Sequence, residues 1–197
     1  MKIEGGQNLI DYIRGKKAFS FDSCRTFFRN LKCYLYNYWI TYFPSYQVRH
    51  WYLKHVLGVK IGKGSFCASR LLFLADKDHS NDTVIGRNVD IIGDVVIGDH
   101  VAIAAHCIIQ SVSHHVNSKS FSGFMKRITI EDYVWFGNRV VVLPGISDKK
   151  GGVVGANSLV SRDVNAGAIV VGSPAREINI RSKEGLQYCL NYRPMFN

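Results

Sequence analysis

Isoleucines recur every six residues in the middle of the chain, and this spacing is the feature that most constrains the fold. Five follow one another without a gap, and small residues follow most of them: Ile85, Ile91, Ile97, Ile103 and Ile109. Ile61 lies in the same phase, with Cys67 and Phe73 between, whereas the polar His79 indicates a loop. An α-helix repeats every 3.6 residues and a strand every two. A period of six therefore predicts short strands joined by corners, three to a coil, with one inward side chain per strand and coils stacked into an aliphatic core.

A second register of inward positions follows, shifted by three from the first. Its members are Ile130, Phe136, Val142, Asp148, Val154 and Val160. The shift predicts an inserted loop near residues 110–129. Asp148 puts an acid in an inward slot, so we expect either a bulge in the coil there or Ile146 turned inward instead.

The predicted fold is all-β: a parallel β-helix of hexapeptide repeats with a short N-terminal helical segment. We expect three regions: 1–57 helical, 58–181 the β-helix, and 182–197 a C-terminal tail. Residues 19–57 interleave Phe, Tyr and Trp with Lys and Arg, which predicts one or two helices broken near Pro44. Such a segment can cover the first open coil or lie at a membrane interface, and the two roles are compatible.

Charge and cysteine content limit the environment and the partners. The net charge is +10 over 197 residues; residues 1–57 hold nine Lys/Arg and three Asp/Glu, or +6 (9 − 3). This excess favours anionic partners, but no nucleic-acid-binding motif is present. Five cysteines without a C-x-x-C pair indicate reduced thiols. The N-terminus lacks the apolar core of a signal peptide, and the uncharged stretch Cys33–Val48 is too short for a membrane span. We expect a cytoplasmic location, with peripheral attachment to the inner face of the membrane through 19–57 as an added hypothesis.

Four segments carry a family resemblance: IGDHVAIAAHCII, ITIEDYVWFGNRVVVLPGI, VVGANSLVSRDV and VVGSPAREI. They resemble the hexapeptide-repeat acetyltransferases, a group that includes galactoside, maltose and serine acetyltransferases and exopolysaccharide O-acetyltransferases. The resemblance covers about residues 58–181. It implies a left-handed β-helix, an exception to the usual crossover hand, and homotrimers that bind acetyl-CoA and acceptor between neighbouring chains.

The resemblance implies an acetyl-CoA-dependent O-acetyltransferase that needs no metal. Its implied acceptor is a sugar hydroxyl in cell-surface polysaccharide synthesis, and a lipid-linked sugar is one form that this acceptor can take. Serine or an amino sugar as acceptor, a metal-dependent enzyme and a non-catalytic β-helix remain alternatives. His100 and His106 lie six apart and would form a zinc site only with a third ligand.

Transfer to a hydroxyl requires a general base, which the family places where the repeat gives way to the loop. His114 and His115 lie at that junction, and the count from Ile97 favours His114 as the catalytic base. A carboxylate often orients such a histidine. Asp94 is the nearest candidate, with Asp90 behind it, and Asp94 and His115 are our supporting residues.

The remaining candidate residues follow from the family's motifs. Trp135 resembles the aromatic that walls the acceptor site, and Asn138 matches the position whose backbone N–H serves as oxyanion donor. Small residues let the pantetheine arm approach the backbone, while two arginines offer charge to the coenzyme phosphates. These coenzyme-binding candidates are Gly155, Ala156, Ser161, Arg162, Gly172, Ser173, Pro174 and Arg176.

Overall fold

The computed structural model describes residues 21–59, 61–67, 72–75 and 81–190. The predicted N-terminal helices are present as α2 (Phe21–Tyr38), the short 3-10 helix η1 (Ile40–Tyr42) and α3 (Tyr46–His55). Pro44 falls in the break between η1 and α3, as the sequence predicts, because proline lacks the N–H that would continue a helix. The predicted loop at His79 and the sequence ends lie outside the described residues.

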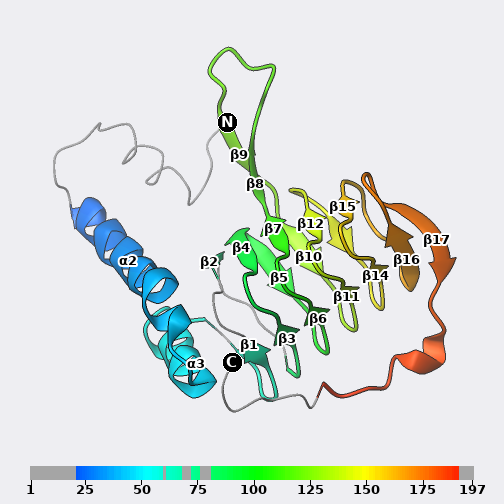
Figure 1. Ribbon diagram of the computed structural model, residues 1–197. Helices are drawn as coiled ribbons and strands as arrows, with labels where there is room; N and C mark the ends of the chain where they lie inside the picture. The colour runs from blue at the N-terminus through cyan, green and yellow to red at the C-terminus, as the bar shows by residue number, and fades with distance from the viewer. Residues whose placement is uncertain (1–20, 60, 68–71, 76–80, 191–197) are drawn as a thin grey trace.

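The rest of the chain coils through three sheets whose strands pair in parallel between successive coils (Figure 1). The first sheet contains β1 (Phe66–Cys67), β3 (Val84–Ile85), β6 (Ala102–Ile103), β11 (Trp135–Phe136), β14 (Val153–Val154), β16 (Ala168–Val171) and, antiparallel at its edge, β17 (Arg176–Ile180). The second contains β2 (Leu72–Ala75), β4 (Asp90–Gly93), β7 (Ile108–Gln110), β12 (Val141–Val142) and β15 (Leu159–Val160). The third contains β5 (Val95–Ile97), β10 (Ile128–Ile130) and β13 (Ser147–Asp148). The predicted parallel β-helix is therefore confirmed.

Both predicted ladders form the core. All eleven of their positions from Ile85 to Val160 are buried. Glycines after the inward residues allow the corners to stack closely: a Cβ on Gly86 would lie 2.8 Å from the backbone of Ala104, and one on Gly137 would lie 2.7 Å from the Ala156 nitrogen. The small residues of the repeat are thus required by the spacing of the coils.

Asp148 occupies its inward slot directly, without a bulge. It pairs in register with Ile130 on one side and bridges Val164 on the other. Its side chain is 1% exposed, and Ile146 is buried as well. Neither carboxylate oxygen has a hydrogen-bond partner in the described part of the chain. Burial therefore raises the pKa of Asp148 to about 8, with a smaller contribution from the charge of Glu131.

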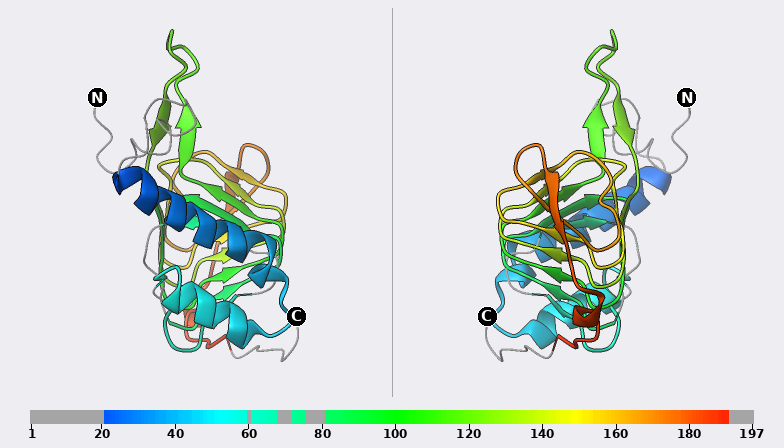
Figure 2. Two further views of the ribbon diagram at one scale, coloured as in Figure 1. Left: turned by 90° about the vertical axis from the view of Figure 1, so that its left-hand side faces the viewer. Right: turned by 90° about the vertical axis from the view of Figure 1, so that its right-hand side faces the viewer.

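The inserted loop is a β-hairpin. In the first sheet, Val84 pairs with Ala102 one coil further along, and Ala102 in turn pairs with Trp135 on the next coil. The second of these two coils takes up far more of the chain than the first. The extra residues of this longer coil leave the stack at a corner and form the two strands of the hairpin, β8 (Val112–His114) and β9 (Gly123–Met125). The hairpin projects away from the stacked coils (Figures 1 and 2).

The helical segment packs against the first coil. Tyr36 and Leu53 join the hydrophobic core, and the Tyr46 ring meets the edge of Phe66 on β1 at 5.5 Å between centroids. The Cys67 backbone N–H donates to His50 Nε2 at 3.0 Å. The helices thus cover the open end of the ladder, one of the two roles predicted for this segment.

The surface of α2 and η1 nevertheless carries exposed aromatic and aliphatic side chains. They are Phe27, Phe28, Leu31, Tyr34, Leu35, Tyr38, Trp39 and Tyr42. None of the helices in the described residues combines the length and apolar character needed to cross a bilayer.

Candidate functional site

His114 ends β8, and its orientation is fixed by two contacts within the hairpin. Its Nδ1 lies 3.0 Å from the Phe121 carbonyl oxygen. Its ring stacks on the Phe121 ring, with 4.6 Å between centroids and 10° between planes. Because a carbonyl only accepts, Nδ1 carries the proton in this arrangement, which leaves Nε2 as an acceptor on an exposed side chain.

His115 follows directly but is held differently. Its backbone N–H donates to the Ser122 carbonyl at 2.9 Å, and its ring tilts against Phe124 at 4.7 Å. The two histidines therefore pack on different aromatic rings. Of the two, only His114 has a described hydrogen bond from a ring nitrogen to a backbone carbonyl, which identifies the nitrogen that carries the proton.

Within the described residues of one chain, Asp94 contacts Arg127 and His114 contacts Phe121. Both carboxylate oxygens of Asp94 bind Arg127 Nε, at 3.1 and 2.9 Å, and the Asp94 backbone N–H donates to the Ser111 hydroxyl at 2.7 Å. The pair lies at the base of the hairpin, since Ser111 precedes β8 and Arg127 follows β9. The position expected for a carboxylate beside the histidine is taken by the Phe121 carbonyl.

Sequence reasoning missed Arg127 as the partner of Asp94. A signal was available, because the two residues are as far apart in the sequence as the paired residues Ala102 and Trp135, which also lie on either side of the insertion. Equal offsets place residues at equivalent positions of neighbouring coils.

Trp135 points outward from β11 and is 48% exposed. Asn138 lies at the following corner, where its side-chain oxygen accepts a hydrogen bond from the Ala105 N–H at 3.1 Å. The Asn138 side chain therefore helps to hold two coils together, and this structural use is independent of the oxyanion role predicted for its backbone.

The predicted coenzyme-binding residues gather on the last coils. Gly155 has no room for a side chain, because a Cβ would lie 2.6 Å from Val171 Cγ1. Gly172 has a φ of +99°, which favours glycine. Arg162 is exposed, and Arg176, also exposed, begins β17. The predicted base and these residues thus lie on different parts of the chain, the hairpin and the last coils, with Trp135 on a coil between them.

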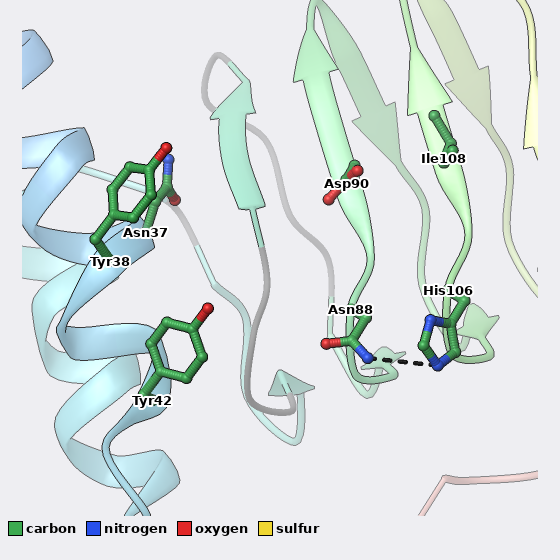
Figure 3. Close-up of a pocket in the computed structure, with 7 residues that line it drawn as sticks. All are labelled: Asn37, Tyr38, Tyr42, Asn88, Asp90, His106 and Ile108. Atoms are coloured by element: carbon green, nitrogen blue, oxygen red, sulfur yellow. Dashed lines mark hydrogen bonds between the residues drawn. The ribbon is translucent and has the colours of Figure 1, made fainter.

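A groove of about 630 Å³ lies between the helical segment and the second sheet (Figure 3). Tyr38, Tyr42 and Asn37 line it from one side; Asp90, Asn88, His106 and Ile108 line it from the other. His106 Nε2 lies 3.4 Å from the Asn88 amide nitrogen, and burial raises the pKa of Asp90. No repeat or motif indicated this groove, because it depends on how the helix lies beside the coils.

The two histidines that lie six apart in the sequence, His100 and His106, are not neighbours in the stack of coils. One full coil runs from Val84 to its partner Ala102, so positions six apart fall at successive corners of the same coil. His100 instead stacks on Tyr133, one coil along, with 4.6 Å between centroids.

Comparison with known proteins places the chain among acetyltransferases. No family model matches it. It is 36% identical over 119 residues to the galactoside O-acetyltransferase of Escherichia coli, covering 53% of this chain and 59% of that one. It is 35% identical over 92 residues to the galactoside O-acetyltransferase of Lactococcus lactis, covering 44% of each. The match thus spans roughly half the length of these two relatives. A longer match, 30% identical over 146 residues, covers 74% of this chain and 73% of YvoF of Bacillus subtilis, itself a candidate acetyltransferase.

Solved structures agree on the fold. A maltose O-acetyltransferase from Clostridium difficile has a TM-score of 0.58 at 22% identity, over 79% of this chain and 85% of that one. A galactoside acetyltransferase in complex with coenzyme A has a TM-score of 0.54 at 23% identity, over 81% and 82%. With the sheet order above, these neighbours bear out the left-handed β-helix. The chain therefore belongs to the hexapeptide-repeat acetyltransferases.

Proposed function

We propose that this protein is an acetyl-CoA-dependent O-acetyltransferase that uses His114 as general base on a sugar hydroxyl. The observation that carries the proposal is the hydrogen bond from His114 Nδ1–H to the Phe121 carbonyl, which leaves the exposed Nε2 free to accept a proton. A base within hydrogen-bond reach of the acceptor hydroxyl is the main requirement for this transfer. Family membership supports the acyl-transfer chemistry, and the relatives named for galactoside and maltose support a sugar acceptor.

In the proposed reaction, His114 both removes the proton from the acceptor and returns it to the leaving group. His114 Nε2 takes the proton as the acceptor oxygen attacks the thioester carbonyl. The backbone N–H of Asn138 is the proposed donor to the resulting oxyanion. When the carbon–sulfur bond breaks, the proton returns from His114 to the departing thiolate, so free coenzyme A and an acetyl ester leave.

The groove beside α2 is the proposed binding place for the distant part of a large acceptor. Two tyrosine rings, two amides, a carboxylate and an imidazole are side chains that can pack on and hydrogen-bond to sugars. Ile108 precedes His114 by six residues, which span at most about 20 Å when extended. A chain of several sugar units would bridge that distance, which supports an acceptor from cell-surface polysaccharide synthesis over a single free sugar.

The location and assembly form part of the same proposal. The exposed aromatic side chains of α2 that do not line the groove, with the basic charge of residues 1–57, support peripheral contact with an anionic membrane, where a lipid-linked acceptor would be found. The family resemblance supports assembly into homotrimers. The unpaired cysteines support a reducing, cytoplasmic compartment. Co-sedimentation with anionic and neutral lipid vesicles tests the membrane contact.

Acetylation assays test the activity. Radiolabelled acetyl-CoA is offered with single sugars, oligosaccharides, nucleotide sugars and serine. We expect label on a sugar, released by mild alkali because an ester is labile where an amide is stable. Better use of oligosaccharides than of single sugars would support the groove. Alkali-stable label would show an amino group as acceptor, and no transfer to any of these compounds would contradict the proposed function.

Coenzyme binding is tested separately by calorimetry. We expect changing both Arg162 and Arg176 to Ala to weaken coenzyme A binding by about tenfold or more, because charge-assisted contacts to phosphate are lost. Arg87→Ala, which removes an exposed arginine from an earlier coil, is the matched control and should bind normally. Equal affinity in all three proteins would place the phosphates elsewhere.

A further inference from the structure

A column of corner residues outside the proposed active site holds an imidazole and a carboxylate in contact. Asp82, His100 and Tyr133 occupy equivalent corners of successive coils, each in the left-handed region with φ of 54°, 58° and 61°. His100 Nδ1 lies 3.1 Å from Asp82 Oδ2, and the His100 ring stacks on Tyr133 with 19° between planes. Stacking and hydrogen bonding together fix the direction of the imidazole.

The C-terminal tail returns along this column and brings a thiol to it. The Tyr188 hydroxyl donates to the carbonyls of His100 and Tyr133, at 3.3 and 3.4 Å. Two residues later, the Leu190 N–H donates to Asp82 Oδ2 at 2.7 Å. Cys189 lies between these two anchors, and its Sγ, a carboxylate oxygen of Asp82 and a ring nitrogen of His100 all lie within 4.8 Å of one another.

We propose that Asp82, His100 and Cys189 form a zinc site that fastens the C-terminal tail to the β-helix. Zinc takes nitrogen, sulfur and oxygen ligands at about 2.0–2.3 Å in tetrahedral sites, so its ligand atoms lie about 3–4 Å apart. The His100–Asp82 distance already fits, and the thiol needs to move by only about 1 Å to reach that spacing. Water completes the fourth position.

The binding step releases one proton and changes no oxidation state. The Cys189 thiol gives up its proton to solvent and binds as thiolate. The ring nitrogen of His100 that faces the ion binds through its lone pair, and the other ring nitrogen carries the proton. Asp82 keeps its hydrogen bond from the Leu190 N–H, which orients the carboxylate as an outer partner does at known sites.

Calorimetric titration of the reduced 197-residue protein with Zn²⁺, free of chelators, tests the site. We expect one strong equivalent, weakened at least tenfold in Cys189→Ser, Asp82→Asn and His100→Asn. Asn is chosen for the corner positions because it tolerates the left-handed region. His106→Asn, at a corner with φ of 65°, and Cys33→Ser are the matched controls and should bind as the original protein does. Co²⁺ in place of Zn²⁺ should show a thiolate charge-transfer band that Cys189→Ser loses.

A second measurement reports on the tail itself. Zn²⁺ should slow tryptic cleavage at Arg181 and Lys183 in the original protein and leave the rate unchanged in Cys189→Ser. Absence of binding at micromolar Zn²⁺, or binding that the control variants lose equally, would overturn the site. Neither result bears on acetyl transfer, which is measured independently.

Discussion

The hydrogen bond between His114 and the Phe121 carbonyl decides which face of the imidazole can act as a base. A carbonyl carries no charge, so it fixes the tautomer without the electrostatic stabilisation of imidazolium that a carboxylate would add. The hairpin supplies both partners, because residues 114 and 121 lie on its two sides, where the paired strands give way to the connecting loop. Orientation of the proposed base is therefore a local property of the hairpin.

His114→Ala should lower the acetylation rate by about 100-fold or more, the scale of losing a general base. Coenzyme affinity should change little, because the residues proposed to bind it lie on the last coils. Steady-state kinetics and calorimetry measure the two effects separately.

His115→Ala is the control for the neighbouring position and should keep most of the activity, since its ring packs on Phe124 instead. An inactive His115→Ala with an active His114→Ala would move the base by one residue. Full activity in both variants would remove the base from this hairpin altogether.

Asp148 should make the protein less stable as the pH rises. Its pKa is raised from 3.8 to about 8 by burial, so the folded protein holds a proton between pH 4 and pH 8 that the unfolded chain has released. Its contribution to the free energy of unfolding therefore falls through that window by up to several kcal/mol, at about 1.4 kcal/mol per pKa unit.

Asp148→Asn isolates this effect, because the amide keeps the size of the side chain and does not titrate. Urea unfolding at several pH values should show a slope in the original protein relative to the variant. The comparison also cancels His50, whose pKa burial lowers to about 4 and which destabilises the fold on the acid side. If the free energy of unfolding varies with pH in the same way in both proteins, the Asp148 carboxyl is hydrogen-bonded or reached by solvent in the folded state.

At the scale of elements, Arg49 joins the helical segment to the first coil. Its side chain is buried in α3 and donates to three carbonyls, those of Phe43, Pro44 and Cys67. The first two belong to the bend before α3 and the third ends β1. One guanidinium therefore satisfies carbonyls on both sides of the contact between helix and β-helix.

Arg49→Met should lower the free energy of unfolding by about 2–4 kcal/mol, because buried carbonyls lose their donors while the apolar stem is kept. Chemical denaturation followed by circular dichroism measures it. Arg29→Met, an exposed position on α2, is the control and should stay within about 0.5 kcal/mol. A neutral Arg49→Met would show that water can replace the guanidinium.

The elements show what a single sequence determines. The ladders from Ile85 to Ile109 and from Ile130 to Val160 could be predicted, because each coil repeats the same burial pattern. The insertion could be located because its length is not a multiple of the repeat, and it therefore shifts the phase of the ladder that follows. Contacts made once could not be predicted: the groove beside Tyr38 and the return of Cys189 to Asp82 depend on packing between distant segments.

For the whole molecule, we expect a trimer of about three times 22.2 kDa. Within one chain the proposed base lies on the hairpin, whereas the proposed coenzyme-binding residues lie on the last coils, and a site shared by neighbouring chains would bring such groups together. Light scattering measures the mass. A monomer that still transfers acetyl groups would contradict the shared site.

The two ends of the coil ladder differ, and this affects how molecules meet in solution. A stack of parallel strands could in principle add the next molecule end to end and grow into a filament, because each open edge offers unpaired backbone groups. Here α3 lies over the first coil, while β17 turns back antiparallel along β16 at the last. Among the described residues of the first sheet, neither end therefore presents the parallel edge that another copy's end would need. The stack of coils is therefore not extended by a second molecule at its end. At high protein concentration, molecules should associate side by side and should not grow into filaments.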